Sequence, residues 1–389
     1  MGIFEKIPEL PVDPILGITA AFKADPHPGK CSFIIGFYRD EHLKTPILET
    51  VAEVEKRIAE ARLKREYLPI DGDPEFVNAI EELVFGKTED RICGVQTIGG
   101  TGALALSGQL ATKWTDQIAI SNLTWANHWK IYQMAGLKTE PYPYYEERHL
   151  CFEKMIENLS SLPEKSCVLV HTNCHNPTGL DLSHDEWQTL LEVTEKKNLF
   201  PILDMAYQGF SAAPEQDAYG PRLFLEKGVE FALTYTCAKN FSLYGERAGA
   251  LFVVGESKKK MEAVRSQIKS MIRGTYSNPP IHPAAVVKGI LRDATLHEKW
   301  LTELSVMRQR MHAIREAFID RMIKKDPEGN WEPIRSGKGL FCNTELSTKA
   351  IEKLRKEKGI YFAADGRINL TGINQENIEV ITDAIVAAK

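Results

Sequence analysis

The chain has 389 residues, of which 43% are hydrophobic and 26% charged, enough for two or three domains with a large core. Its formal net charge of −5 argues against binding nucleic acid through a broad basic face. The seven cysteines show no CxxC spacing, which argues against a disulfide scaffold and a structural zinc site. No apolar run is long enough to span a bilayer. We therefore expect a cytoplasmic globular protein that binds neither membranes nor nucleic acid.

In chain order, residues 1–14 contain three prolines and predict an extended N-terminal arm. Apolar residues then recur at helical spacing over 47–67. Further along, short apolar runs predict strands, and they cover residues 93–97, 117–121, 166–171, 200–204, 231–235 and 250–254. Helical segments lie between these strands, for example at 102–112, 186–197 and 223–227. Such alternation indicates a parallel, doubly wound α/β sheet.

The pattern changes near Met307, where a long helix is followed by shorter mixed elements up to the last residue. We therefore predict a large α/β domain over residues 46–306. A smaller α+β domain would combine residues 15–45 with residues 307–389. No stretch rich in glycine and serine separates the two parts, so we expect them to be joined without a flexible linker.

Polar residues and glycines follow five of the predicted strands, and open α/β sheets bind ligands beyond the carboxyl ends of their strands. After the first strand, Gly99–Gly102 opens a helix, where backbone N–H groups and the helix dipole favour an anion. Gly100, Gly102 and Ala105 also fit a loose dinucleotide fingerprint, but Asn122 stands where that fingerprint requires an acid. A tight turn without a ligand is the simpler alternative.

Lys239 follows the apolar strand at 231–235 and precedes Arg247 by eight residues. Partial burial beside a second cation would lower its pKa and leave a nucleophilic amine, although an isolated lysine is usually a solvated charge. Asp204 ends another apolar strand, so its carboxylate needs a partner. It would suit the protonated ring nitrogen of a pyridoxal cofactor, and a helix cap is the alternative.

Other polar and aromatic side chains near these strand ends suit a flat ring with charged groups. Tyr207 lies three residues after Asp204, and Asn176 lies at a neighbouring strand end, so both could reach a ring oxygen. Trp125 offers an aromatic face for stacking, although Trp125 in the core and Asn176 in a turn are the simpler interpretations. The fork of an arginine matches two oxygens of a carboxylate or phosphate, and the candidates are Arg247, Arg273 and Arg367.

Together these motifs resemble the class I aminotransferases of the aspartate aminotransferase type, within the fold-type I pyridoxal-phosphate enzymes. The resemblance covers nearly the whole chain and rests on motifs that occur in order at 11–17, 99–102, 175–179, 204–210, 276–280 and 366–369. It implies a large domain with a mostly parallel seven-stranded sheet plus a smaller α+β domain. It also implies pyridoxal 5′-phosphate as the cofactor, with no metal ion.

The resemblance implies a role for each motif residue near the cofactor. Lys239 would hold the cofactor covalently and then shuttle the proton, while Asp204 would pair with the ring nitrogen. Tyr207 and Asn176 would hold the ring oxygen, and Trp125 would stack on the ring. The phosphate would be bound by Gly100, Thr101, Thr236 and Arg247, together with Tyr67 supplied by the partner subunit.

The resemblance also implies how the substrate binds. Arg367 would bind the α-carboxylate, and Arg273 would reach from the partner subunit to the side-chain carboxylate. Gly36 would contact the substrate where the small domain closes, with Trp125 and Asn176 also in contact. Two histidines, His128 and His171, match positions behind Asp204. The stretch before the lysine departs from the family, because Ala238 lacks a hydroxyl that is common there.

The sequence therefore predicts a homodimeric pyridoxal-phosphate-dependent aspartate aminotransferase, which interconverts L-aspartate and 2-oxoglutarate with oxaloacetate and L-glutamate. An aminotransferase for aromatic or a broad range of amino acids is the nearest alternative. A nicotinamide-dependent oxidoreductase, based on the Gly100 loop, is a second alternative. It leaves Lys239 unexplained and lacks the acid that its fingerprint needs. A non-catalytic binding protein on the same scaffold is the third alternative.

Overall fold

The computed structural model describes residues 2–9 and 14–389. A short 3-10 helix, η1 (Ile3–Lys6), lies within the segment for which an extended arm was predicted. Backbone hydrogen bonds from Glu5 to Gly2 and from Ile7 to Phe4 close its turn. Helix α1 (Pro14–Ala24) starts at a proline, a residue that suits the first helical turn. The rest of the predicted arm, at residues 1 and 10–13, lies outside the described residues.

The centre of the molecule is a seven-stranded sheet with the order β2-β10-β9-β8-β7-β3-β4. Its strands are β2 (Ile92–Ile98), β3 (Gln117–Ser121), β4 (Lys138–Tyr142), β7 (Cys167–His171), β8 (Phe200–Met205), β9 (Phe231–Thr236) and β10 (Ala248–Val254). Within the described chain, four strand pairs are parallel, and β10 is antiparallel to both of its neighbours. The predicted fold class, an α/β fold with a mostly parallel seven-stranded sheet, is confirmed, and β10 is the strand of this sheet that runs antiparallel.

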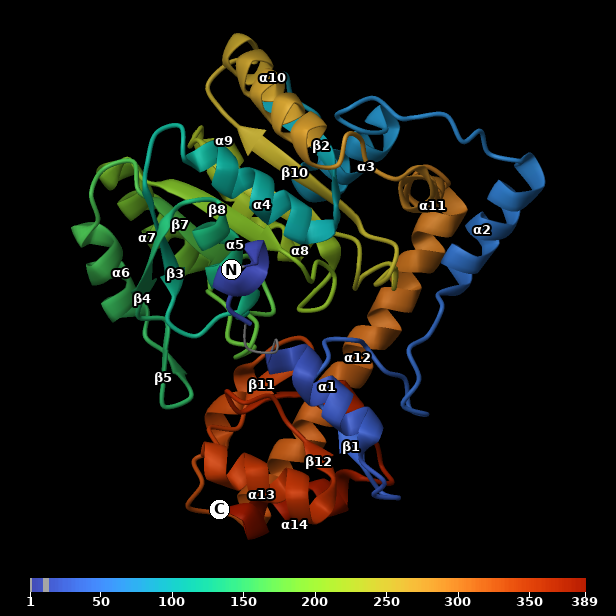
Figure 1. Cartoon of the computed structure of the whole chain (residues 1–389), viewed down its shortest axis with the longest axis vertical. Helices are drawn as coiled ribbons and strands as arrows, with labels where there is room; N and C mark the ends of the chain where they lie inside the picture. The colour runs from blue at the N-terminus through green and yellow to red at the C-terminus, as the bar shows by residue number, and fades with distance from the viewer. Residues whose placement is uncertain (1, 10–13) are drawn as a thin grey trace.

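The six predicted strands all form, because their residues are mostly apolar and almost all buried between the layers that cover both faces of the sheet. Strand β4 was not predicted, because its residues are mostly exposed and include Pro141, as an edge strand allows. A two-stranded hairpin of β5 (Tyr145–Glu146) and β6 (His149–Leu150) follows it. Figure 1 shows this hairpin extending from the sheet toward the C-terminal part of the chain.

Helices cover both faces of the sheet and make it a three-layer structure (Figure 1). One hydrophobic cluster lies between the sheet and the helices α4 (Gly99–Ala111), α5 (Asn127–Met134) and α10 (Lys258–Thr275). The cluster on the opposite face involves α3 (Pro74–Phe85), α6 (Phe152–Ser161), α7 (His184–Lys197), α9 (Tyr219–Lys227) and α11 (Ile281–Leu291). The short helix α8 (Pro214–Asp217) precedes α9.

Helix α12 (Ala294–Lys325) leads from this body to a second core, and it starts earlier than the predicted helix near Met307. Trp300 packs in the core on the sheet, whereas Phe318 packs in the second core. The second core is built on α13 (Thr348–Lys358), α14 (Ile378–Ala388), and the strand pairs β1 (Cys31–Ser32) with β12 (Ile360–Tyr361) and β11 (Phe341–Asn343) with β13 (Arg367–Asn369). The 3-10 turns η2 (Glu332–Ser336) and η3 (Leu370–Gly372) complete it.

Helix α2 (Glu49–Ala61) is shorter than the helix predicted over 47–67. It ends at Arg62, which has a left-handed backbone (φ 52°), so the following residues leave the helical path. Tyr67 consequently lies in an irregular segment, and its side chain is 92% exposed. Among the residues that the structure describes, no helix combines the length and hydrophobicity that crossing a membrane requires.

Candidate active site

Most of the predicted site residues lie at one edge of the large sheet. The strands β3, β7, β8 and β9 are mutually parallel and end at this edge. Strand β2 also ends there, because it is antiparallel to β10, which is itself antiparallel to β9. Since β10 runs in the opposite direction, it begins at this edge, and Arg247 directly precedes its first residue. The antiparallel strand therefore places this arginine beside residues that follow the other strands.

Asp204 in β8 is buried at this edge, and both of its carboxylate oxygens are held. Thr234 Oγ1 donates to Oδ1 at 2.7 Å, and His128 Nε2 lies 3.3 Å from Oδ2. Burial disfavours the charged carboxylate, but these hydrogen bonds outweigh it and keep the pKa of Asp204 below its usual value. The residue predicted to pair with a ring nitrogen is therefore a negatively charged carboxylate held in place.

Two histidines stand behind this carboxylate. His128 Nε2 faces Asp204 Oδ2, and the other ring nitrogen, Nδ1, lies 2.9 Å from Thr124 Oγ1, with which it forms a hydrogen bond. His171 packs against His128 with ring centroids 5.1 Å apart, and burial lowers the pKa of His171 to about 3, so its ring is neutral. His128, His171 and Asp204 are also the one cluster of metal-ligand type within the described chain. Because His128 and Thr234 already occupy both oxygens of Asp204, we interpret this cluster as support for the carboxylate.

Lys239 lies in the turn after β9, partly buried, and its amine is available for chemistry. Its Nζ lies 5.2 Å from the centroid of the Tyr207 ring and makes no hydrogen bond or ion pair with the described residues. Burial and the nearby Arg247 charge lower the pKa of Lys239 to about 8, although Asp204 opposes this shift. A substantial fraction of the amine is therefore neutral near physiological pH, as a nucleophile requires.

The start of helix α4 forms an anion-binding cradle beside Arg247. The helix has no side-chain cap, so its first N–H groups are available to a ligand. A Cβ added at Gly99 would lie 2.6 Å from Arg247 Nη2, and one at Gly100 would lie 3.1 Å from Thr236 Cβ. Only glycine allows this close approach, and Thr101 follows in the first turn. The helix starts at Gly99, three residues before the predicted start at 102, and Gly99 itself has a positive φ of 71° that suits glycine.

Arg367 in β13 is buried without a carboxylate partner among the described residues. Its Nη1 donates to Asn176 Oδ1 and its Nη2 to the carbonyl of Ile34, each at 2.9 Å. The remaining Nε is buried without a hydrogen-bond partner, and the guanidinium lies 4.6 Å from the centroid of the Phe341 ring. A Cβ at Gly36 would lie 2.8 Å from the same ring, so Gly36 lets Phe341 reach Arg367. An unpaired buried guanidinium fits a carboxylate ligand.

These residues fit pyridoxal phosphate. An unpaired amine, an anion cradle and a fixed carboxylate at one sheet edge match its aldehyde, phosphate and ring nitrogen. Trp125, the residue predicted to stack on the ring, is partly exposed and packs edge-on against His128, with centroids 5.2 Å apart. Tyr207 is buried at the same edge, and burial raises the pKa of its hydroxyl, which therefore stays protonated as a donor.

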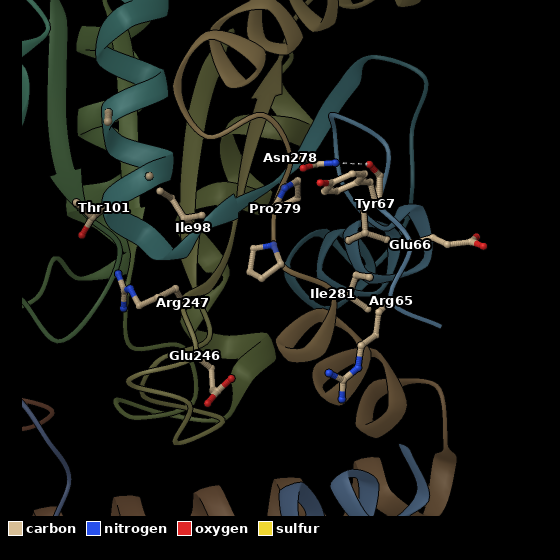
Figure 2. Close-up of a pocket in the computed structure, with 14 residues that line it drawn as sticks. Arg65, Glu66, Tyr67, Ile98, Thr101, Glu246, Arg247, Asn278, Pro279 and Ile281 are labelled. Atoms are coloured by element: carbon tan, nitrogen blue, oxygen red, sulfur yellow. Dashed lines mark hydrogen bonds between the residues drawn. The ribbon is translucent and has the colours of Figure 1, made fainter. Parts of the chain in front are cut away.

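Tyr67 and Arg273 are not brought into this cluster. Arg273, at the end of α10, is exposed and donates to the Ser277 hydroxyl. Tyr67 lines a surface hollow whose opposite wall carries Thr101 and Arg247 (Figure 2). Within one chain, neither side chain contacts Lys239, Asp204 or Arg367, in keeping with the expectation that both act on a partner.

Two residues of the site were not predicted from the sequence. Thr234 supports Asp204, and its position could have been found, because alternate strand residues share a face and Thr236 is two residues away. Phe341 stacks on Arg367, but no motif surrounds it, and only the pairing of β11 with β13 brings it there.

Known proteins resemble this chain over its whole length. The family model described as "Aminotransferase class I and II" matches residues 28–385. Aspartate aminotransferases from Escherichia coli and Pseudomonas aeruginosa are 39% and 38% identical and cover 99% of this chain, which spans 100% and 99% of them. An aromatic-amino-acid aminotransferase from Burkholderia pseudomallei, covalently bound to pyridoxal phosphate, superposes with a TM-score of 0.96 at 36% identity, with 100% of both chains covered. The chain belongs to the class I and II aminotransferase family.

Proposed function

We propose that this protein is a pyridoxal-phosphate-dependent aspartate aminotransferase that acts as a homodimer in the cytoplasm. It would interconvert L-aspartate and 2-oxoglutarate with oxaloacetate and L-glutamate. The observation that carries the proposal is the unpaired Lys239 amine, with its lowered pKa, at the sheet edge that holds Asp204 and that Arg367 contacts through Asn176. The aspartate aminotransferases from E. coli and P. aeruginosa support this substrate.

When bound, pyridoxal phosphate supplies an aldehyde for the substrate amine and a cationic ring that stabilises negative charge on the substrate Cα. The residues of this chain hold and orient these groups. The α4 start, Thr236 and Arg247 bind the phosphate, while Arg367 fixes the substrate through its α-carboxylate. Asp204 keeps a proton on the ring nitrogen, because its charge is held by two hydrogen bonds.

Lys239 moves the proton. Lys239 would hold the cofactor through its aldehyde, and its neutral ε-amine would be the base that takes the proton from the substrate Cα and the acid that returns it. Tyr207, protonated and buried next to Lys239, donates to the ring oxygen. Asn176 is orientated by Arg367, so substrate binding and cofactor orientation share one pair of side chains.

The dimer and the location rest on separate observations. Tyr67 is 92% exposed beside a phosphate cradle that its own chain leaves open, which supports exchange of this residue between two subunits. All seven cysteines are free thiols, a state that persists in the reducing cytoplasm.

The direct test is a substrate panel on purified protein. We expect a visible absorbance band that borohydride abolishes, a dimeric mass in solution, and transfer of the amino group from aspartate to 2-oxoglutarate. Borohydride should attach the cofactor to Lys239, as peptide mass spectrometry would reveal. Attachment to another lysine, or a preference for phenylalanine over aspartate, would overturn the corresponding part of the proposal.

An aromatic-amino-acid aminotransferase is the second candidate, and one observation favours it. The solved structure from B. pseudomallei, with its TM-score of 0.96, carries that activity in its name. A comparison of kcat/KM for aspartate and phenylalanine distinguishes the two candidates.

The shared site has its own test with hybrid dimers. A Lys239→Ala subunit mixed with an Arg273→Ala subunit should regain aspartate activity, because one site of each hybrid then has both residues. Mixing Lys239→Ala with Asp204→Ala is the matched control and should regain none, since both residues act within their own chain. Equal failure of both mixtures, in confirmed hybrids, would refute the exchange of Arg273.

A further inference from the structure

A buried chain of hydrogen bonds beneath the Lys239 turn takes no part in the steps described above. Its centre is Tyr235 in β9, which is 0% exposed. Because successive strand residues face opposite sides, Tyr235 points away from the face that carries Thr234 and Thr236. Its hydroxyl accepts from Asn240 Nδ2 at 2.8 Å and donates to Gln208 Oε1 at 2.9 Å.

The two partners of this hydroxyl are the chain neighbours of two site residues. Asn240 directly follows Lys239, and Gln208 directly follows Tyr207. The Tyr235 hydroxyl therefore joins the turn that carries the amine to the loop that carries the phenol. On the other side of the sheet edge, Lys239 Nζ lies 5.2 Å from the centroid of the Tyr207 ring.

Both ends of this hydrogen-bond chain are fixed to the core. Gln208 Nε2 donates to the carbonyl of Pro214 at 2.9 Å. Trp300 of α12 donates from Nε1 to the carbonyl of Asn240 at 2.8 Å, and it stacks on Phe241 with centroids 4.7 Å apart. This chain of hydrogen bonds thus connects the Pro214 carbonyl to Trp300 of α12, and it passes through the single hydroxyl of Tyr235.

The Asn240 amide has no second partner to replace Tyr235. Its Oδ1 is buried without a hydrogen bond among the described residues, so loss of the hydroxyl would leave the whole amide unpaired. The backbone bonds of the turn, such as Ser242 N–H to the Lys239 carbonyl, are local and hold its shape. Ser242 Oγ anchors only the far end of the turn, on the carbonyl of Pro46.

We propose that Tyr235 is a positioning residue of the reaction, whose hydroxyl holds the Lys239 turn in register with the Tyr207 loop. The inference rests on the proposed function, because it concerns where the amine of Lys239 is held. Misplacing a catalytic group by about 1 Å costs roughly a hundredfold in rate. Removal of the hydroxyl is therefore expected to lower turnover while substrate binding through Arg367 persists.

The test uses Tyr235→Phe in the holoenzyme, which deletes only the hydroxyl. We expect kcat for aspartate to fall roughly ten- to a hundredfold with KM changed little. The visible absorbance of the cofactor on Lys239 should titrate with a midpoint displaced by about half a pH unit or more. This midpoint reports the surroundings of the amine, which a general loss of stability does not change.

Tyr142→Phe is the matched control. Tyr142 is equally inaccessible, with 1% exposure, and its hydroxyl donates to the carbonyl of Leu169 at 2.8 Å, away from the Lys239 turn. The Tyr142→Phe variant loses one buried tyrosine hydroxyl, as the Tyr235→Phe variant does, so we expect a comparable change in Tm. Its kcat and absorbance midpoint should equal those of the unmodified protein.

If Tyr235→Phe has the same kcat and the same absorbance midpoint as Tyr142→Phe, the inference is overturned and the proposed function stays intact. An unmodified protein that binds no pyridoxal phosphate would overturn the proposed function itself. If Tyr235→Phe yields no folded protein, Gln208→Met takes its place, because it removes the acceptor on the Tyr207 side together with the Nε2 donor to the carbonyl of Pro214. The same displaced midpoint is then expected, and an unchanged midpoint would refute the inference.

Discussion

The sheet edge around Lys239 and the surface around Tyr67 differ in how complete each is within one chain. At the sheet edge, Asp204 and Arg367 are buried and held by hydrogen bonds before any ligand arrives. At the surface, Tyr67 is 92% exposed and Arg273 contacts only its neighbour Ser277. The core fixes the side chains of the first region, whereas the side chains of Tyr67 and Arg273 in the second region are exposed.

This difference distinguishes the residues that would move protons or hold charge from those that a partner subunit would bring to the site. Groups that move protons or hold charge need a fixed position and low solvent access, which a folded core provides. Tyr67 and Arg273, which would bind the phosphate and the substrate side chain, gain such surroundings only if a second chain covers them. We therefore expect substitutions at the sheet edge, and of Tyr67 at the phosphate, to affect every substrate, and substitution of Arg273 to affect substrates selectively.

The largest effect is expected for Lys239→Ala. No other amine approaches the Tyr207 ring within the described chain, so turnover should fall by a factor of about 10⁴ or more. Single-turnover absorbance measurements would follow the loss, and retained cofactor would show that the phosphate cradle works independently. Residual turnover within tenfold of the unmodified protein would mean that another group moves the proton.

Asp204→Ala is expected to reduce turnover by about a thousandfold, because the ring nitrogen would lose its proton and its charged partner. An N-methylated cofactor analogue, whose ring stays positive, should restore part of the rate of Cα proton abstraction. Hydrogen exchange at Cα, followed by NMR, measures that step directly. If the analogue restores nothing, Asp204 has a role other than stabilising ring charge.

Arg273→Leu and Arg367→Ala test the contrast between selective and general effects. Loss of a desolvated carboxylate contact costs about 2–5 kcal/mol, or roughly 30- to several-thousandfold in kcat/KM. Arg367→Ala should impair aspartate and phenylalanine together, since both carry an α-carboxylate. Arg273→Leu should impair aspartate alone and leave Tm unchanged in this exposed position. Equal losses for both substrates in Arg273→Leu would make that residue structural.

The smallest effect concerns the pH dependence of cofactor capture. Because the pKa of Lys239 is lowered to about 8, its amine is protonated below this pH and neutral above it. The rate at which cofactor-free protein reacts with pyridoxal phosphate should rise with pH through about 8 and then level off. At pH 7 it should be about tenfold below the plateau. A rate that keeps rising toward pH 10.5, as for a free lysine side chain, would contradict burial of the amine.

The residues that the sequence revealed are those with a local signature. Lys239 and Asp204 follow apolar strands, and the ends of parallel strands meet at one edge, so the pattern was sufficient to place them together. Strand β10 was found, but its direction was not, because an apolar run contains no information about orientation. The route by which Arg247 reaches the site therefore became visible only in the structure.

Contacts between distant segments had no such signature. Phe341 and Arg367 meet through the β11–β13 pair, and the sequence shows neither strand clearly, since each has three residues. The predicted large and small domains remain predictions at their boundaries. The boundary proposed between residues 306 and 307 falls inside α12, where no change of composition marks the passage from one core to the other.

Helix α12 has a consequence for how the protein unfolds. With 32 residues it is about 48 Å long, and it buries Trp300 in one core and Phe318 in the other. Breaking the helix between them would expose backbone hydrogen bonds without releasing either apolar side chain, so partial unfolding gains little entropy for its cost. Heat and denaturant should therefore melt both cores in one transition, as a single thermodynamic unit.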